Sequence, residues 1–363
     1  MDMQIHLRRE PPVYINVDAV CGHVLLTCET QVDIATVTVK LSGSAVSRIN
    51  TQQLTESHLL FKISEQLFPP DGCAGAFTSR SVTLPPGKHL FPFSIKLPPA
   101  TQCYKSATPP QLRTQAPHLM RKLPPSTGDS SSPEEIKYVL EATIRQDGVI
   151  RAPRRTVSIH PILTPGFYLP DHIGTQAREI YLRCRSTIDL PLHGQHAQVQ
   201  RQRISYSTGH SEIKSRPLTY EVTIELLNGP FLSLGQPIPL AVQAQGMDGS
   251  TSSNNIALYD FQSMIFETTE VRARGAVERL TRSWIVQTMA NLQQLFTYTP
   301  GDERNHGSVD DSLWRPWCVP LFLTPTFETC NVSRDYKLEI RLGIGLGRNN
   351  VCFCFSFAVN VNL

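Results

Sequence analysis

The chain has 363 residues, enough for two domains of ordinary size, each with a hydrophobic core of its own. Its 28 prolines and the scarcity of helix-period runs favour an all-β protein with many loops. The formal net charge of +3 is small for this length and the arginines are scattered, which argues against a nucleic-acid-binding protein.

The nine cysteines argue against a zinc site and against a secreted disulfide framework, because their number is odd and no CxxC pair is present. The first ten residues, MDMQIHLRRE, lack the apolar core of a signal peptide. No run of about 18 uncharged apolar residues follows them. We therefore expect a soluble cytoplasmic protein in a reducing compartment, with neither a metal nor a cofactor.

The first clear strand lies at residues 35–41. Apolar residues at positions 35, 37, 39 and 41 alternate with polar ones, and Ser42-Gly43 closes the segment. This period of two is typical of a strand with one buried face.

The stretch from Leu84 to Pro98, LPPGKHLFPFSIKLP, combines a turn with a second strand. Pro86-Gly87 suits a type II turn, because proline sets φ at the first corner and glycine accepts a positive φ at the second. One face of the following strand is apolar and consists of Phe91, Phe93, Ile95 and Leu97. Pro92 places this strand at a sheet edge or near a strand start.

Two long segments separate the remaining strands. Residues 100–128 contain no acidic residue but several prolines, serines and basic residues, which predicts a long, mobile, basic loop. Periodicity fades from 164 to 216 and then returns, most regularly at 220–226 and 351–361. We therefore predict a β-sandwich over residues 1–163, a linker over 164–216 and a second β-sandwich over 217–363.

These stretches together resemble the arrestin family. The segment at 84–98 is similar to the LPxGxHxFPFxFxLP signature of the arrestin N-terminal domain, and LPPS at 123–126 and the strand at 138–144 resemble the motifs that follow it. In the second half, LGQPIPL at 234–240 resembles the turn GxxIPL, and NVSRDY at 331–336 resembles NISxxYxL. One departure is the corner usually written PGD, which is NVD at 16–18.

The resemblance covers nearly the whole chain outside 100–122 and 164–216, and the chain looks like an α-arrestin or arrestin-related trafficking adaptor of the fungal type. It implies two immunoglobulin-like β-sandwiches, the arrestin fold.

Residues 276–296 are ambiguous, because Val277, Leu280 and Trp284 could form a helical stripe while Ser283–Val286 reads as strand. Analogy with arrestins favours a strand hairpin there.

No motif of a catalytic site is present. We find no GxSxG elbow, no Walker loop and no HExxH. His193 and His196 form an HxxH pair without an obvious third ligand, so we interpret it as part of a solvated linker, with a metal site as the alternative. We predict that the protein is not an enzyme.

Pro11-Pro12-Val13-Tyr14 is a PPxY motif, the ligand that WW domains bind in an aromatic groove and a tyrosine pocket. In arrestin-related adaptors such motifs recruit a WW-bearing HECT ubiquitin ligase, usually from a C-terminal tail. Tyr14 also coincides with the tyrosine of the first-strand signature of the family, and a packed ring cannot enter a WW pocket. We favour the packed ring and keep Pro11, Pro12 and Tyr14 as a candidate docking site.

A second candidate site consists of Arg8, Arg9 and Lys88. The resemblance implies that basic residues of the N-terminal domain hold acidic or phosphorylated cytoplasmic tails, and guanidinium groups suit phosphate and carboxylate. The alternative is that each is an ordinary surface charge.

We expect a non-catalytic adaptor that binds the cytoplasmic parts of membrane transporters or receptors. It would direct their ubiquitination, endocytosis and endosomal sorting, with recruitment to the plasma membrane or endosomes. The alternatives are a structural subunit of an endosomal sorting coat and a signalling scaffold without ligase docking.

Overall fold

The computed structural model describes residues 1–9, 13–15, 18–69, 81–103, 121–146, 149–151, 154–159, 182–190, 218–246, 256–298, 306–346 and 349–362. Within these ranges nearly all regular structure is β-strand, so the prediction of an all-β protein is confirmed. Two short 3-10 helices accompany the strands, η1 (Asn50–Gln52) and η3 (Asp311–Leu313). No helix in the described ranges has the length and apolar character needed to cross a membrane.

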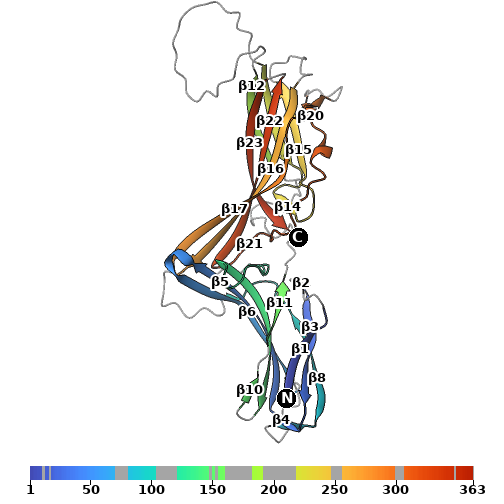
Figure 1. The fold of residues 1–363 in the computed structure, drawn as a ribbon, viewed down its shortest axis with the longest axis vertical. Helices are drawn as coiled ribbons and strands as arrows, with labels where there is room; N and C mark the ends of the chain where they lie inside the picture. The colour runs from blue at the N-terminus through green and yellow to red at the C-terminus, as the bar shows by residue number, and fades with distance from the viewer. Residues whose placement is uncertain are drawn as a thin grey trace, which may run out of the picture.

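The first domain is a sandwich of two main sheets (Figure 1). One sheet has the order β1 (Asp2–Leu7), β3 (Ala19–Cys28), β8 (Gly87–Lys96). The other has the order β2 (Val13–Tyr14), β11 (Arg154–Ile159), β9 (Glu134–Gln146), β5 (Thr36–Ile49), β6 (Leu54–Phe68), with β10 (Val149–Arg151) on β9. A small sheet pairs β4 (Val32–Ile34) with β7 (Val82–Leu84).

Strand β8 contains the proline-interrupted strand of the sequence analysis. Among the described strands it pairs only with β3, so Pro92 lies on an edge strand, as its missing N–H requires. Phe93 and Ile95 face the core and are at most 5% exposed. The predicted alternation along this strand is confirmed.

The second domain is also a sandwich. Its five-stranded sheet has the order β12 (Leu182–Leu190), β13 (Leu218–Leu226), β15 (Leu240–Gly246), β20 (His306–Ser308), β19 (Thr297–Tyr298). Its seven-stranded sheet has the order β14 (Phe231–Ser233), β23 (Asn349–Asn362), β22 (Val332–Leu346), β16 (Ile256–Ala273), β17 (Ala276–Met289), with β18 (Gln294–Leu295) on β16 and β21 (Phe327–Glu328) on β22.

Strand β12 falls inside the range predicted to be a linker, 164–216. It pairs with β13 along its whole length, so residues 182–190 are strand rather than linker. The alternation in LRCRSTIDL is the signal that could have indicated it. The rest of that range, including His193 and His196, lies outside the described residues.

The ambiguous segment 276–296 forms strands β17 and β18, so the hairpin is confirmed and a helix is excluded. Arg274 and Gly275 connect β16 to β17 and both have positive φ, 50° and 85°. Two consecutive positive φ values match the right-handed twist of the strands they join, which is why a tight hairpin forms here.

Each domain has a core, but the core of the first domain includes residues of the second. Val271, Ala273, Phe327 and Val332 pack into the first core. They lie on β16, β21 and β22, at the end of the seven-stranded sheet that reaches β5 and β6 (Figure 1). The two sandwiches therefore share buried surface where they meet, and this shared surface is called the junction below.

Gly22 on β3 occupies a place where no side chain fits. A Cβ at this position would lie 2.2 Å from the backbone oxygen of His6 and 2.8 Å from the Phe93 ring. Gly22→Ala should therefore displace β1 and lower the free energy of unfolding by about 1–3 kcal/mol in urea denaturation. Gly246→Ala is the control, because its Cβ would meet only the Tyr220 ring at 3.8 Å. Equal effects of the two substitutions would contradict this prediction.

Candidate functional site

Arg8 and Arg9 follow β1 directly, at the end of the three-stranded sheet nearer the second domain (Figure 1). The backbone N–H of Arg8 donates to the oxygen of Cys21 at 2.9 Å, which fixes the chain beside β3. Both side chains are exposed. Together with Tyr14, Ala19 and Cys21 they line an open depression of about 510 Å³.

Arg9 links Val13 and Tyr14 of β2 to Asp18. Its Nη1 donates to Asp18 Oδ2 at 2.6 Å and to the backbone oxygen of Val13 at 2.8 Å, and its guanidinium lies over the Tyr14 ring, 5.0 Å from the centroid. The N–H of Ile15 also donates to Asp18 Oδ2 at 3.1 Å. Burial opposes ionisation of Asp18, but the hydrogen bonds from Ile15 and Arg9 outweigh it and lower its pKa.

Arg8 differs from its neighbour. Among the described residues its guanidinium has no hydrogen bond and no ion pair, so its charge faces solvent over the depression. Arg9 uses only Nη1 for Asp18 and Val13, which leaves the other edge of its planar fork uncommitted in the described structure. The pair can therefore present several N–H donors to an anion while Arg9 keeps its hydrogen bonds to Asp18 and Val13.

Tyr14 is 2% exposed and belongs to the core of the first domain. Strand β2 pairs with β11, and Tyr14 lies opposite Ile159. Pro11 and Pro12 lie outside the described residues. In this conformation the ring of Tyr14 is covered by Arg9 and is not presented to a WW pocket.

Lys88 lies far from the two arginines. It is exposed near the start of β8 and pairs with Thr27, whereas Arg8 contacts Cys21 at the other end of β3. Six residues of strand between Cys21 and Thr27 correspond to roughly 20 Å. The structure thus brings Arg8 and Arg9 together and leaves Lys88 at the opposite end of the sheet.

A buried ion pair lies at the junction, and sequence reasoning missed it. Arg334 Nη2 of β22 lies 2.6 Å from Glu134 Oε1 of β9, and both side chains are at most 5% exposed. Glu267 Oε2 of β16 is 3.7 Å from Arg334 Nε and accepts a 3.0 Å hydrogen bond from the hydroxyl of Tyr336. Arg334 also donates to hydroxyls of Thr269, Thr127 and Thr324.

Asn331 extends this polar contact toward β5. Its Nδ2 donates to the backbone oxygen of Ala45 and to Ser47 Oγ, both at 3.1 Å. Ser47 Oγ in turn donates to the backbone oxygen of Arg272 at 2.5 Å. These bonds join the end of the seven-stranded sheet to the first domain, so each domain satisfies buried polar groups of the other.

Residues 3–159, which end at the last residue of β11, match the sequence model of the arrestin (or S-antigen) N-terminal domain. The first domain belongs to the arrestin family. No curated protein matches the chain. Arrestin domains are in general parts of non-catalytic adaptors that bind membrane receptors and trafficking partners.

The polar contacts of Arg334 and Asn331 thus connect an arrestin domain to the second sandwich. A signal for them existed in the sequence, because Arg334, Glu134 and Glu267 each occupy an inward-facing position of an alternating strand. A charge at such a position is expensive unless it is paired. Alternation alone does not tell which partner it meets.

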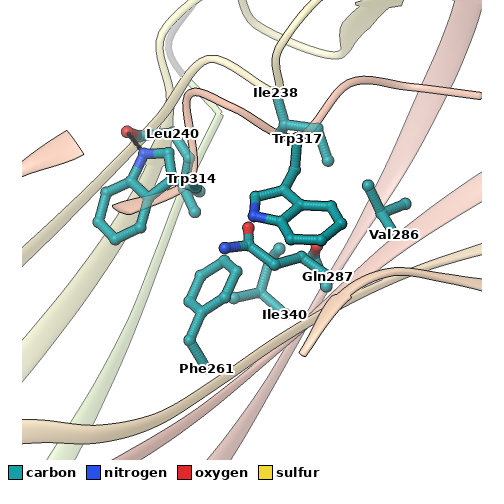
Figure 2. Close-up of a pocket in the computed structure, with 9 residues that line it drawn as sticks. Ile238, Leu240, Phe261, Val286, Gln287, Trp314, Trp317 and Ile340 are labelled. Atoms are coloured by element: carbon teal, nitrogen blue, oxygen red, sulfur yellow. Dashed lines mark hydrogen bonds between the residues drawn. The ribbon is translucent and has the colours of Figure 1, made fainter. Parts of the chain in front are cut away.

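The second sandwich contains a small apolar hollow (Figure 2). Trp314, Trp317, Phe261 and Gln287 line it, and its volume is about 10 Å³. The Nε1 of Trp314 donates to the backbone oxygen of Leu240 at 2.9 Å, so this ring is fixed from the core side. Such a volume holds about one water molecule, far less than the roughly 300–1,000 Å³ of a small-molecule site.

Proposed function

We propose that this arrestin-like protein is an adaptor that binds the cytoplasmic parts of membrane transporters or receptors and directs their ubiquitination, endocytosis and endosomal sorting. It would act in the cytoplasm and be recruited to the plasma membrane or endosomes. The observation that carries the proposal is the arrestin domain at 3–159, which places an exposed arginine pair beside an open depression.

The chemistry of the depression suits an acidic or phosphorylated tail. Arg8 offers a guanidinium without a partner in the described structure, and Arg9 offers the edge of its fork that Asp18 does not use. Phosphate and carboxylate accept two parallel N–H bonds from such a fork, which lysine cannot provide. We therefore assign the recognition of acidic groups to Arg8 and Arg9, and only long-range attraction to Lys88.

A peptide-binding experiment tests this assignment. The probe is a fluorescent peptide with a run of phosphoserines and aspartates, and its affinity is measured by fluorescence polarisation. Arg8→Glu should weaken binding about tenfold or more, because a hydrogen bond to a charged group contributes roughly 1.5–3 kcal/mol. The affinity of the unaltered protein should also fall as salt is raised.

Lys88→Glu is the matched control, since it makes the same change of charge about 20 Å away. It should reduce affinity much less than Arg8→Glu. Arg9→Glu is a poorer variant, because it would place a carboxylate against Asp18 and remove the hydrogen bonds to Asp18 and Val13. An affinity that is independent of salt, or equal in the Arg8 and Lys88 variants, would contradict the proposed site.

Ligase recruitment through Pro11, Pro12 and Tyr14 would require the buried Tyr14 ring to leave the core. The burial of Tyr14 favours the second candidate function, a sorting-coat subunit or scaffold that does not itself dock a ligase. Binding of an isolated WW domain to the folded protein, lost on Tyr14→Ala, would support direct docking. Absence of such binding would leave recruitment to another chain.

A further inference from the structure

A cluster of one histidine and two cysteines lies at the junction, separate from the arginine depression. His58 lies on β6, Cys103 lies beside that strand, and Cys330 lies between β21 and β22 of the second domain. Nδ1 of His58 is 3.3 Å from Sγ of Cys103, and all three donor atoms lie within 4.8 Å of one another.

The backbone holds these three side chains in place. The N–H of Gln102 donates to the oxygen of Leu60 on β6 at 2.6 Å, which sets Cys103 next to His58. On the other side, the N–H of Arg272 donates to the oxygen of Asn331 at 2.8 Å, which fixes the residue after Cys330. Cys103 is 4% exposed, and Cys330 and His58 are partly buried.

The spacing of the donor atoms is close to that of a tetrahedral zinc site. Zinc binds cysteine sulfur at about 2.3 Å and histidine nitrogen at about 2.0–2.1 Å, so neighbouring ligand atoms lie roughly 3.5–3.8 Å apart. The observed 3.3 Å between Nδ1 and Sγ is within a few tenths of this separation. The third donor atom, Sγ of Cys330, lies within 4.8 Å of both of the others.

A carboxylate orients the histidine from the other side. His58 Nε2 lies 2.6 Å from Glu56 Oε1, while Oε2 of the same carboxylate accepts the N–H of Arg274 at 2.6 Å. With its proton on Nε2, the ring turns the Nδ1 lone pair toward the two sulfur atoms. In zinc sites, a histidine ligand usually donates its other ring N–H to a carboxylate in this way.

We propose that His58, Cys103 and Cys330 bind one Zn²⁺ and that the ion clasps the two domains together. The two cysteines would bind as thiolates, and three protein ligands leave a fourth position for water. A disulfide between Cys103 and Cys330 would leave the oriented His58 without a role in the cluster. The ligands come from both domains, so the bound ion would stabilise their relative arrangement. This inference does not depend on the proposed adaptor function.

The test uses the full chain, purified under reducing conditions and incubated with Zn²⁺ before unbound metal is removed. Elemental mass spectrometry should find about one zinc per chain. Substitution by Co²⁺ should give the absorption bands of a tetrahedral site with thiolate ligands. Cys330→Ser and Cys103→Ser should weaken zinc binding by about 100-fold or more, since even the loss of an outer partner weakens it 10- to 100-fold.

Two further variants show whether a loss of zinc binding comes from the lost ligand or from misfolding. Cys318→Ser alters an exposed cysteine in the same domain as Cys330, and this variant should bind zinc like the unaltered protein. Glu56→Gln keeps all three ligands and should weaken binding about 10- to 100-fold. Far-ultraviolet circular dichroism checks that each variant folds.

Zinc content in the reduced, unaltered protein no higher than in Cys330→Ser would overturn the proposal. The proposal would also be overturned if Cys103 and Cys330 form a disulfide and the protein binds no zinc even after that disulfide is reduced. The cluster would then be a redox-sensitive link between the domains. Binding that Cys318→Ser abolishes and Cys330→Ser leaves intact would also reject the assigned ligands.

Discussion

Replacing Arg334 with alanine is expected to lower the free energy of unfolding by about 3–5 kcal/mol. The substitution leaves two carboxylates, Glu134 and Glu267, buried at the junction without their shared cation. An unpaired buried charge is far more costly than the intact pair is stabilising, because the remaining carboxylate has lost both water and its partner. Urea denaturation followed by circular dichroism measures the change.

Arg341→Ala is the matched control, since Arg341 lies on the same strand and pairs with Glu339 at 2.7 Å, but with a side chain 47% exposed. Glu339 is largely buried but keeps Lys337 as a second partner at 3.3 Å, so this variant should lose at most about 1 kcal/mol and remain close to the unaltered protein. Similar losses for the two arginines would show that the Arg334–Glu134 pair is not buried as described.

The Arg334 variant should also affect the contact between domains. Arg334 lies on the second domain and Glu134 on the first, so their separation removes a restraint on the relative position of the two sandwiches. Limited proteolysis should then cut the variant faster than the Arg341 variant, at sites between the domains. A loss of stability without faster cleavage would mean that the pair stabilises one domain only.

Tyr138→Ala is expected to destabilise the first domain by at least about 3–5 kcal/mol. The Tyr138 side chain is fully buried, stacks on Phe61 at 5.8 Å between ring centroids and covers Gly43, where a Cβ would lie 2.6 Å from the ring. Alanine leaves a cavity that the sheet cannot close. The hydroxyl donates to the backbone oxygen of Pro124 at 2.6 Å, and burial raises the pKa of Tyr138 well above its usual value, so the donor keeps its proton.

Tyr138→Phe separates packing from hydrogen bonding. It keeps the ring and removes only the donor to Pro124, so the expected loss is about 1–3 kcal/mol for a buried carbonyl left unpaired. Thermal and urea denaturation of both variants give the comparison. A Phe variant as unstable as the Ala variant would mean that the hydrogen bond, and not the packed ring, fixes the LPPS segment.

The junction has two kinds of contact between the domains, and no sequence motif predicts either of them. The Arg334–Glu134 pair and the Asn331 hydrogen bonds join buried polar groups of the two domains, and the His58–Cys103–Cys330 cluster has the donor set that suits zinc. All involve the end of the seven-stranded sheet, β16 and β22, against β5, β6 and β9 of the arrestin domain. Changes at the junction can therefore alter the relative arrangement of the two domains without touching Arg8 or Arg9.

Local strand structure was predictable from the sequence because a strand repeats every two residues. The alternation at 35–41 and at 220–226 predicted strands that are present, and the proline in 84–98 predicted the edge strand β8. The strand at 182–190 was missed, although its alternation is regular. The ambiguous segment 276–296 needed its partner β16, because nearly all of β17 is exposed or only half-buried, and a strand without a buried face has no strong periodic signal of its own.

The sequence by itself determined which faces of most strands are buried, and its motifs placed the first domain in the arrestin family. Only the tertiary structure decided which buried polar groups meet. Arg334 and Glu134 are 200 residues apart, and Cys330 belongs to a different domain from His58 and Cys103. A period of two records that a position faces inward but not what lies opposite it. That partner is set by how the two sandwiches pack at the junction.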